Sequence, residues 1–190
     1  QNKIYVTGHT NSSDLPCTAN AERNTLNDYE NAFFGVYDQT GSLLYNSYYL
    51  SGYSNIGNAI AISDNGTIYF SGTSNDTTVI ANTSVHQTQN AGNLDGFIIK
   101  LSPNFQTIWK TYFGGAQNDM INAMLIDSLE NVYIVGNTKS NNSISTVNSF
   151  QANYSNNWDG FCIKLDSSSS QAWGTYIGSS SIDELSSLVK

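Results

Sequence analysis

A repeat with a 64-residue period constrains this chain more than any other feature of its sequence. The segment DGFIIKL, residues 95–101, returns as DGFCIKL, residues 159–165, and both copies lead into an aromatic run, TIWKTYFGG and then QAWGTYIGS. Aromatic and glycine positions recur three times at this spacing: Tyr5, Tyr69 and Tyr133; Gly8, Gly72 and Gly136; Phe33, Phe97 and Phe161. Such a repeat indicates an architecture built from copies of one supersecondary unit.

Each unit contains four short runs with the character of β-strands. In the second unit these are NAIAIS (58–63), TIYFSG (67–72), DGFIIKL (95–101) and TIWKTYF (107–113). Dense β-branched and aromatic residues between Asn, Asp and Gly are typical of strands and turns, and no helical periodicity is sustained. We therefore expect an all-β chain, a β-propeller built from 64-residue, four-stranded antiparallel blades. A single propeller region covers residues 1–190, with repeats at 1–66, 67–130 and 131–190.

The order of the runs predicts an open arc of blades. With strands named A to D from the propeller axis outward, the chain runs B-C-D, A-B-C-D, A-B-C-D, A. The final SSLVK, residues 186–190, corresponds to NAMLI, residues 122–126, and predicts a fresh strand A. Propellers have about 4 to 8 blades, so three blades alone should not close. We expect an arc of a larger propeller, continued by further blades of the same chain; the alternative is a second copy that completes six blades.

The charge of the chain argues against two classes of partner. Fifteen acidic and seven basic residues give a net charge of −8, which repels nucleic acid and acidic lipid headgroups. No apolar run approaches the roughly 20 residues that span a bilayer, so no membrane insertion is expected. The chain starts at Gln1 rather than Met, which fits a removed leader or a piece of a longer protein. Both fit a secreted or cell-surface protein.

The motifs also resemble a known family. The order NAIAISDNGTIYFSGTS, then SFQ before a variable loop, then DGFIIKL, then TYFGG followed by an Asp, is similar to the SBBP repeat, named for seven-bladed β-propellers of bacterial secreted and surface proteins. The first repeat departs from this pattern: Asn31 and Ala32 replace the Asp-Gly pair, and residues 50–52, LSG, replace the Gly-Gly end. The resemblance implies the propeller fold and an exported location, and it implies no catalytic residues.

Candidate ligand-binding residues lie first in the loops between strands D and A. Asp119 and Asp183 repeat there, with Asn118 beside the first. In one interpretation they form a polar ring at the axis entrance that binds a cation, a sugar or a peptide. In the other, each carboxylate accepts backbone N–H groups of a tight loop, which is the usual role of a half-buried carboxylate. The repetition favours the structural role.

A second set of candidates lies in the long loops between strands B and C, which differ in every repeat. They contain His86, Tyr154 and Trp158, and aromatic rings on polar loops suit stacking on sugars or capture of peptide side chains. The alternative is that these rings hold their own loops against the blade rim, which we favour because large exposed rings are uncommon.

The sequence contains no recognisable catalytic or metal-binding constellation. His9 and His86 are the only histidines and lie far apart in the repeat frame, so neither a metal cluster nor a triad is expected. We expect no cofactor and no metal. The sequence favours a non-catalytic extracellular or cell-surface module that binds or scaffolds proteins or glycans. The alternative is a propeller hydrolase or lyase with its site in the axial funnel.

Overall fold

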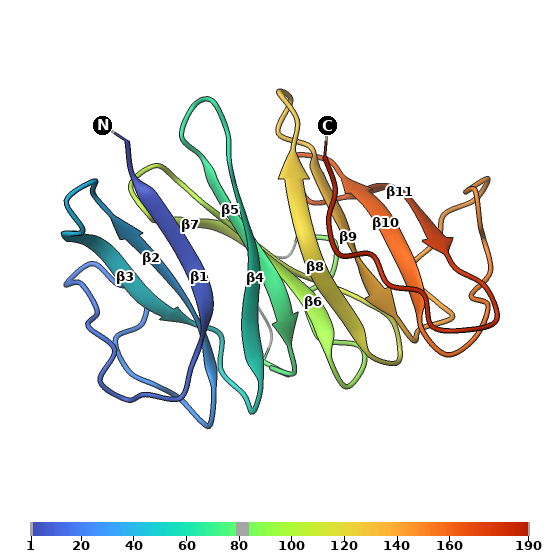
Figure 1. Cartoon of the computed structure of the whole chain (residues 1–190), viewed down its shortest axis with the longest axis horizontal. Helices are drawn as coiled ribbons and strands as arrows, with labels where there is room; N and C mark the ends of the chain where they lie inside the picture. Colours follow the sequence, from blue (N-terminus) through green and yellow to red (C-terminus); the bar gives the residue numbers. More distant parts are fainter. Residues whose placement is uncertain (1, 79–83, 190) are drawn as a thin grey trace.

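The computed structural model describes residues 2–78 and 84–189. This part of the chain is all-β and consists of three antiparallel sheets. It contains no helix, and therefore none long and apolar enough to cross a membrane. The class predicted from the sequence is confirmed at this level, because the three sheets form an open arc of the kind found in a β-propeller (Figure 1).

The sheets are numbered along the chain. Sheet 1 has the order β1 (Ile4–Thr10), β2 (Asn31–Tyr37), β3 (Leu43–Tyr49). Sheet 2 has the order β4 (Asn55–Ile62), β5 (Ile68–Ser74), β6 (Asp95–Leu101), β7 (Thr107–Phe113). Sheet 3 has the order β8 (Asp119–Ile126), β9 (Val132–Thr138), β10 (Asp159–Leu165), β11 (Gln171–Ile177).

Sheets 2 and 3 repeat each other in detail. Every strand of sheet 3 begins one full repeat after its counterpart in sheet 2, as Asp159 of β10 follows Asp95 of β6. The first strand of each sheet carries a bulge at the same place, between Gly57 and Ala59 in β4 and between Ile121 and Ala123 in β8. These strands bring backbone carbonyls close to the repeated glycines of β5 and β9, where a side chain would not fit.

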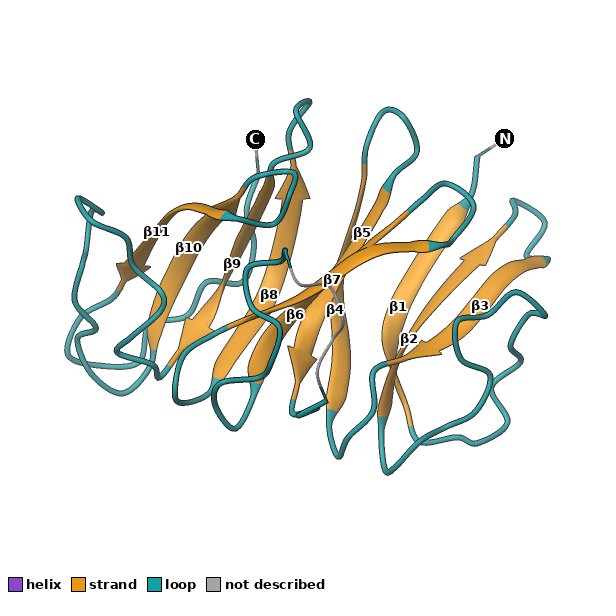
Figure 2. Ribbon diagram, turned by 180° about the vertical axis from the view of Figure 1, so that it is seen from behind, coloured by secondary structure: helices purple, strands orange, loops and turns teal. Residues whose placement is uncertain are grey.

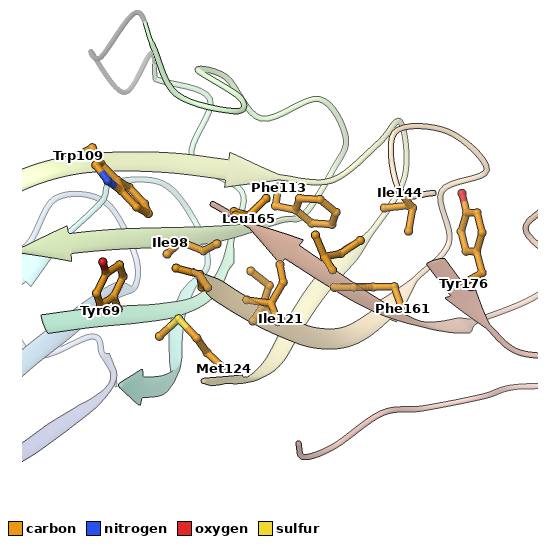
Figure 3. Close-up of a cluster of buried hydrophobic side chains, with 13 residues drawn as sticks. Tyr69, Ile98, Trp109, Phe113, Ile121, Met124, Ile144, Phe161, Leu165 and Tyr176 are labelled. Atoms are coloured by element: carbon orange, nitrogen blue, oxygen red, sulfur yellow. The ribbon is translucent and has the colours of Figure 1, made fainter. Parts of the chain in front are cut away.

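The sheets stack face to face through two apolar clusters. One joins sheets 1 and 2 and includes Phe34, Phe70 and Phe97; the other joins sheets 2 and 3 and includes Trp109 and Phe161 (Figure 3). The inner strands add to the stacking, since β4 contacts β1 and β2, and β8 contacts β4, β5 and β6. Figure 2 shows β3, β7 and β11 on the opposite side of the arc from these inner strands.

The prediction of a strand at residues 186–190 is wrong for the residues of this segment that the structure describes. No strand is assigned to residues 182–189, and residue 190 lies outside the described residues. The segment nevertheless follows the path of β8 one repeat later: the Leu185 carbonyl accepts a hydrogen bond from Asn122 at 2.8 Å, as the Ile121 carbonyl accepts one from Asn58 at 2.7 Å. It is not a strand because no strand B is described beside it, and a strand needs a paired neighbour.

Candidate functional site

The loops that contain the predicted site residues lie together at one edge of the arc, the lower edge in Figure 1. They follow β1, β5 and β9 on one side and β3, β7 and β11 on the other. Hydrogen bonds tie neighbouring loops together: the Asp119 N–H donates to the Leu94 carbonyl at 2.7 Å, and the Lys139 N–H donates to the Asn118 carbonyl at 2.8 Å. We call this edge the loop edge.

Asp119 is the first residue of β8 and is fully buried, not part of an open loop as the sequence predicted. Its carboxylate accepts hydrogen bonds from the Gly115 N–H at 2.7 Å, from the Ser140 hydroxyl at 2.7 Å and from the Thr138 hydroxyl. Burial raises the pKa of Asp119 to about 6, although these hydrogen bonds favour the ionised form. A carboxylate with these partners supports the loop from within.

Asp183 and Asn118 are more open than Asp119. Asp183 is half-buried and accepts the Ser179 N–H at 2.7 Å, the same bond that Gly115 makes to Asp119. The Asn118 side-chain oxygen is buried and has no hydrogen-bond partner in the described part of the chain. Of the three residues, Asp119 is fully buried, and Asp183 and Asn118 are half-buried.

A second repeated carboxylate lies next to Asp119, and sequence analysis missed it. Asp95 is fully buried at the start of β6 and accepts the Gln87 side-chain amide at 2.7 Å and the Ala91 N–H at 2.8 Å. The Gln87 amide oxygen in turn accepts the Gly114 N–H at 3.1 Å. Burial raises the pKa of Asp95 to about 6, and the charge of Asp119 adds to this effect. The return of Gln87 one repeat later, as Gln151, was the signal available in the sequence.

Sheet 3 repeats this arrangement, and sheet 1 replaces it. Gln151 donates to Asp159 at 3.3 Å and accepts the Gly178 N–H at 3.0 Å. In sheet 1, Arg23 and Asn31 occupy the Gln and Asp positions, and both side chains donate to the Leu50 carbonyl. The departures that the sequence shows in the first repeat are thus parts of one altered hydrogen-bond group.

Each of the three aromatic candidates contacts another side chain of this chain through its ring. His86 stacks on Phe113 at 5.4 Å between ring centroids, and its burial lowers the pKa of its imidazole. The ring centroid of Tyr154 lies 6.0 Å from that of Tyr176, and the Tyr154 hydroxyl donates to the Asn157 carbonyl. The Lys139 ammonium lies 4.8 Å from the ring centroid of Trp158. All three candidates are half-buried, so part of each ring remains accessible at the rim.

An exposed aromatic pair at the loop edge of sheet 1 was not found by sequence analysis. Tyr29 and Tyr53 stack with their ring centroids 4.9 Å apart and their planes 10° from parallel, and they are 56% and 68% exposed. Neighbouring acids fix the loops that carry them: Asp28 accepts the Gly52 N–H at 3.1 Å, and Glu30 accepts the Ser54 hydroxyl at 3.4 Å. Both tyrosines break the repeat, so periodicity could not point to them.

The opposite edge of the arc contains an acidic pocket of about 370 Å³ between the turns after β4 and β8. Two of its three carboxylates already have hydrogen-bond partners. Asp127 accepts the side chain and N–H of Asn131 at 2.8 and 2.9 Å, and these bonds lower its pKa to about 2. Glu130 accepts the Lys100 ammonium at 2.8 Å. Within residues 2–78 and 84–189 no group of three or more His, Cys, Asp or Glu residues is placed to hold a metal ion.

Stacked antiparallel sheets that repeat along the chain are consistent with an arc of a β-propeller. Residues 108–142 match the family model of the SBBP β-propeller repeat, which confirms the resemblance seen in the sequence. The matched segment contains most of β7 and all of β8 and β9. A search of curated proteins finds no match.

Proposed function

We propose that this chain is part of a larger extracellular or cell-surface β-propeller that binds proteins or glycans and catalyses no reaction. The repeated sheets and the SBBP match support a binding or scaffolding module. The 64-residue blades and a secreted bacterial origin are part of the same proposal, as the resemblance to the repeat family implies. The net charge of −8 suits neutral or basic partners better than acidic ones.

The stacked pair Tyr29 and Tyr53 is the observation that carries this proposal. Tyrosine offers a large rigid ring with a polar tip, and it orders at low entropic cost, which is why it is common in binding surfaces. Each ring of the pair has one face against the other, and both side chains are mostly exposed. Such rings suit stacking on a sugar ring or on an apolar peptide side chain.

The surroundings of the pair suit recognition rather than chemistry. The Glu30 carboxylate lies 3.7 Å from the His9 imidazole, and Asp28 and Glu30 hold the two loops together. These groups offer hydrogen-bond acceptors for sugar hydroxyls or for peptide N–H groups next to the rings. The candidate surface extends along the loop edge through His86, Tyr154, Trp158, Asn118 and Asp183.

A hydrolase or lyase is the second candidate function, because two carboxyls have the raised pKa that a general acid needs. Asp95 and Asp119 both have a pKa raised to about 6. Both are fully buried and hydrogen-bonded to their own loops, so a substrate would need the loop edge to open. The binding module is the simpler function for this arrangement.

Binding to a printed array of oligosaccharides and to a panel of immobilised surface proteins tests the proposal. For a ligand found this way, Tyr29→Ala and Tyr53→Ala should each weaken binding by at least about tenfold, since central aromatic contacts dominate binding energy. Leu129→Ala is the matched control, because Leu129 is 75% exposed on the opposite edge. Binding that is unchanged in both tyrosine variants would contradict the aromatic site.

The same protein should be assayed against a panel of glycoside and ester substrates. No turnover is expected from the wild-type chain. Turnover that is lost in Asp119→Asn or Asp95→Asn, with the fold intact by circular dichroism, would overturn the non-catalytic proposal and support the hydrolase or lyase.

A further inference from the structure

The two ends of the arc are open in different ways. At the first end, β1 is an edge strand, and its Ile4 is 51% exposed whereas the counterpart in β5, Ile68, is 1% exposed. A Cβ added to Gly72 would lie 1.8 Å from the Ile56 carbonyl oxygen of β4, but one added to Gly8 would meet only the Phe33 ring at 3.1 Å. The place beside β1 that an inner strand fills in sheets 2 and 3 is therefore open in the described part of the chain.

At the other end, sheet 3 has an uncovered apolar face. Trp173 and Ile177 are each 38% exposed, whereas their counterparts in sheet 2, Trp109 and Phe113, are 7% and 0% exposed because sheet 3 covers them. Two further apolar residues, 89% and 88% exposed, extend this face and line a groove of about 300 Å³ with Trp173: Val147 and Phe150. Residues 182–189 run along the same end on the path of an inner strand, as Figure 1 shows.

Each end carries one half of the hydrogen-bond group built around Asp119. At the C-terminal end, Asp183 accepts the Ser179 N–H at 2.7 Å, but within the described chain it lacks hydroxyl partners like those that Thr138 and Ser140 provide for Asp119. At the N-terminal end, the counterparts of these hydroxyls are present: the Ser12 N–H donates to Thr10 Oγ1 at 3.0 Å, as the Ser140 N–H donates to Thr138 Oγ1 at 2.9 Å.

The register between β8 and β9 shows how the two halves would meet. In that register Asp119 lies opposite Thr138, Ile121 opposite Gly136 and Met124 opposite Ile134. The counterparts of the β8 residues lie one repeat later in the sequence, and those of the β9 residues lie two repeats earlier. The same register therefore gives the following pairs: Asp183 with Thr10, Glu184 with His9, Leu185 with Gly8, and Leu188 with Val6. The pairs match in size and charge. An acid meets a histidine, a leucine meets a glycine, and two apolar residues meet each other.

We infer that two copies of this chain associate head to tail, with residues 182–189 of each copy lying against β1 of the other. The Trp173 face of sheet 3 then packs on the Ile4 face of sheet 1, as sheet 2 packs on sheet 3 within the chain. The surface on one copy differs from the surface on the other, so the contact is heterologous. Such a contact forms a closed ring only if the rotation that relates the copies brings the chain of copies back to its start. Two arcs of three sheets make six, which lies in the range of about 4 to 8 found for propellers. The match in size and charge between residues 183–188 and residues 6–10 favours a second copy as the occupant.

The mass of the 190-residue chain in solution tests this inference. Native mass spectrometry and light scattering should show a species of twice the 20.7 kDa of one chain. Leu188→Glu and Val6→Glu should each shift the protein to a monomer, since each places an unpaired acid in the new contact. Leu129→Glu, which adds the same charge at an exposed turn, should leave the dimer intact. Circular dichroism of each variant checks that the monomer remains folded.

Mixing the two variants identifies the geometry. Leu188→Glu keeps an intact β1 surface and Val6→Glu keeps an intact C-terminal segment, so an equimolar mixture should form a dimer through one sound contact. Two results would overturn the head-to-tail contact. One is that the mixture forms no dimer; the other is that each single variant still forms the dimer that the wild-type chain forms. A wild-type chain that stays at 20.7 kDa at its highest soluble concentration would overturn the second copy as the occupant and leave further blades of a longer chain.

Discussion

Strands β1 and β5 occupy the same place in the repeat but differ in their surroundings. All seven residues of β5 are buried, while β1 has none that is fully buried. The two sequences are alike, IYVTGHT and IYFSGTS, so composition does not explain the difference. β5 is paired on both edges and covered by sheets on both faces, and within the described chain β1 has one paired edge and one covered face.

The comparison teaches that a sheet of this protein gains its core from its neighbours. In stacked repeats, stability is close to a sum of intrinsic terms and nearest-neighbour interface terms. Sheet 2 has two interfaces, while sheet 1 has only one in the described chain. Equivalent substitutions in sheets 1 and 2 should therefore have unequal effects, and that inequality can be measured.

The largest effect is expected at the repeated phenylalanine. Phe97 is fully buried, and its ring centroid lies 5.8 Å from that of Phe70, whereas its counterpart Phe33 is half-buried. In the monomeric Leu188→Glu background, Phe97→Ala should lower the free energy of unfolding by about 3–5 kcal/mol and Phe33→Ala by about 1–2 kcal/mol, because a better-packed ring leaves a larger cavity when it is truncated. Urea unfolding followed by circular dichroism measures both. Equal losses of stability would break the comparison.

The repeated glycine should show the next largest effect. In Gly136→Ala the new Cβ would lie 1.8 Å from the Met120 carbonyl oxygen, so the backbone of β8 must shift. We expect a loss of about 3 kcal/mol, at the upper end of overpacking costs. In the monomeric Leu188→Glu background, Gly8→Ala meets only a ring edge at 3.1 Å and should cost less than about 1 kcal/mol. Urea unfolding again measures both, and a Gly8→Ala loss as large as that of Gly136→Ala would show that β1 is already covered.

A smaller effect is expected at an ion pair that joins sheets 2 and 3. Glu130 accepts the Lys100 ammonium at 2.8 Å and the Tyr69 hydroxyl at 3.0 Å, and the hydrogen bond from Lys100 lowers the Glu130 pKa to about 2. Glu130→Gln should cost about 1 kcal/mol at neutral pH. Because the folded-state pKa is below the ordinary 4.5, this contribution should disappear as pH falls from about 4.5 to about 2. A loss that does not change with pH would assign the effect to packing.

A pH dependence of opposite sign is expected at Asp95. Its folded-state pKa, raised to about 6, lies above its ordinary 3.8, so folding takes up a proton between these values. Wild-type protein should therefore gain stability relative to Asp95→Asn as pH falls from about 6 to about 4. The difference between the two unfolding midpoints, followed across this range, measures it. A gain as pH rises would mean that the buried carboxylate is ionised and well compensated.

The repeat carried most of the fold prediction. Dense β-branched and aromatic residues between turn residues placed DGFIIKL and TIWKTYF within β6 and β7, and the repeat period then placed their counterparts in sheet 3. The same logic failed at residues 186–190, because a repeat predicts a strand from its own sequence, but strand pairing also depends on a neighbour. It also placed Asp119 in a loop, since the sequence could not show that β4 and β8 begin before their apolar runs, at Asn55 and Asp119.

The candidate site was less predictable. Gln87 and Asp95 belong to one hydrogen-bond group. The return of Gln87 as Gln151 was visible in the sequence, but the sequence does not show that this side chain reaches the start of the strand. Tyr29 and Tyr53 lie in two different loops, and only the folded chain brings their rings to 4.9 Å. Contacts between loops depend on loop conformation, which periodicity does not encode.

Residue-resolved amide hydrogen exchange, measured by nuclear magnetic resonance on monomeric Leu188→Glu, tests the central claim most directly. In β1, amides that pair with β2 should be protected and those that point to the open edge should exchange fast, in alternation along the strand. In β5, paired with both β4 and β6, all the amides should be protected. Uniform slow exchange along β1, or alternation in β5, would contradict the account.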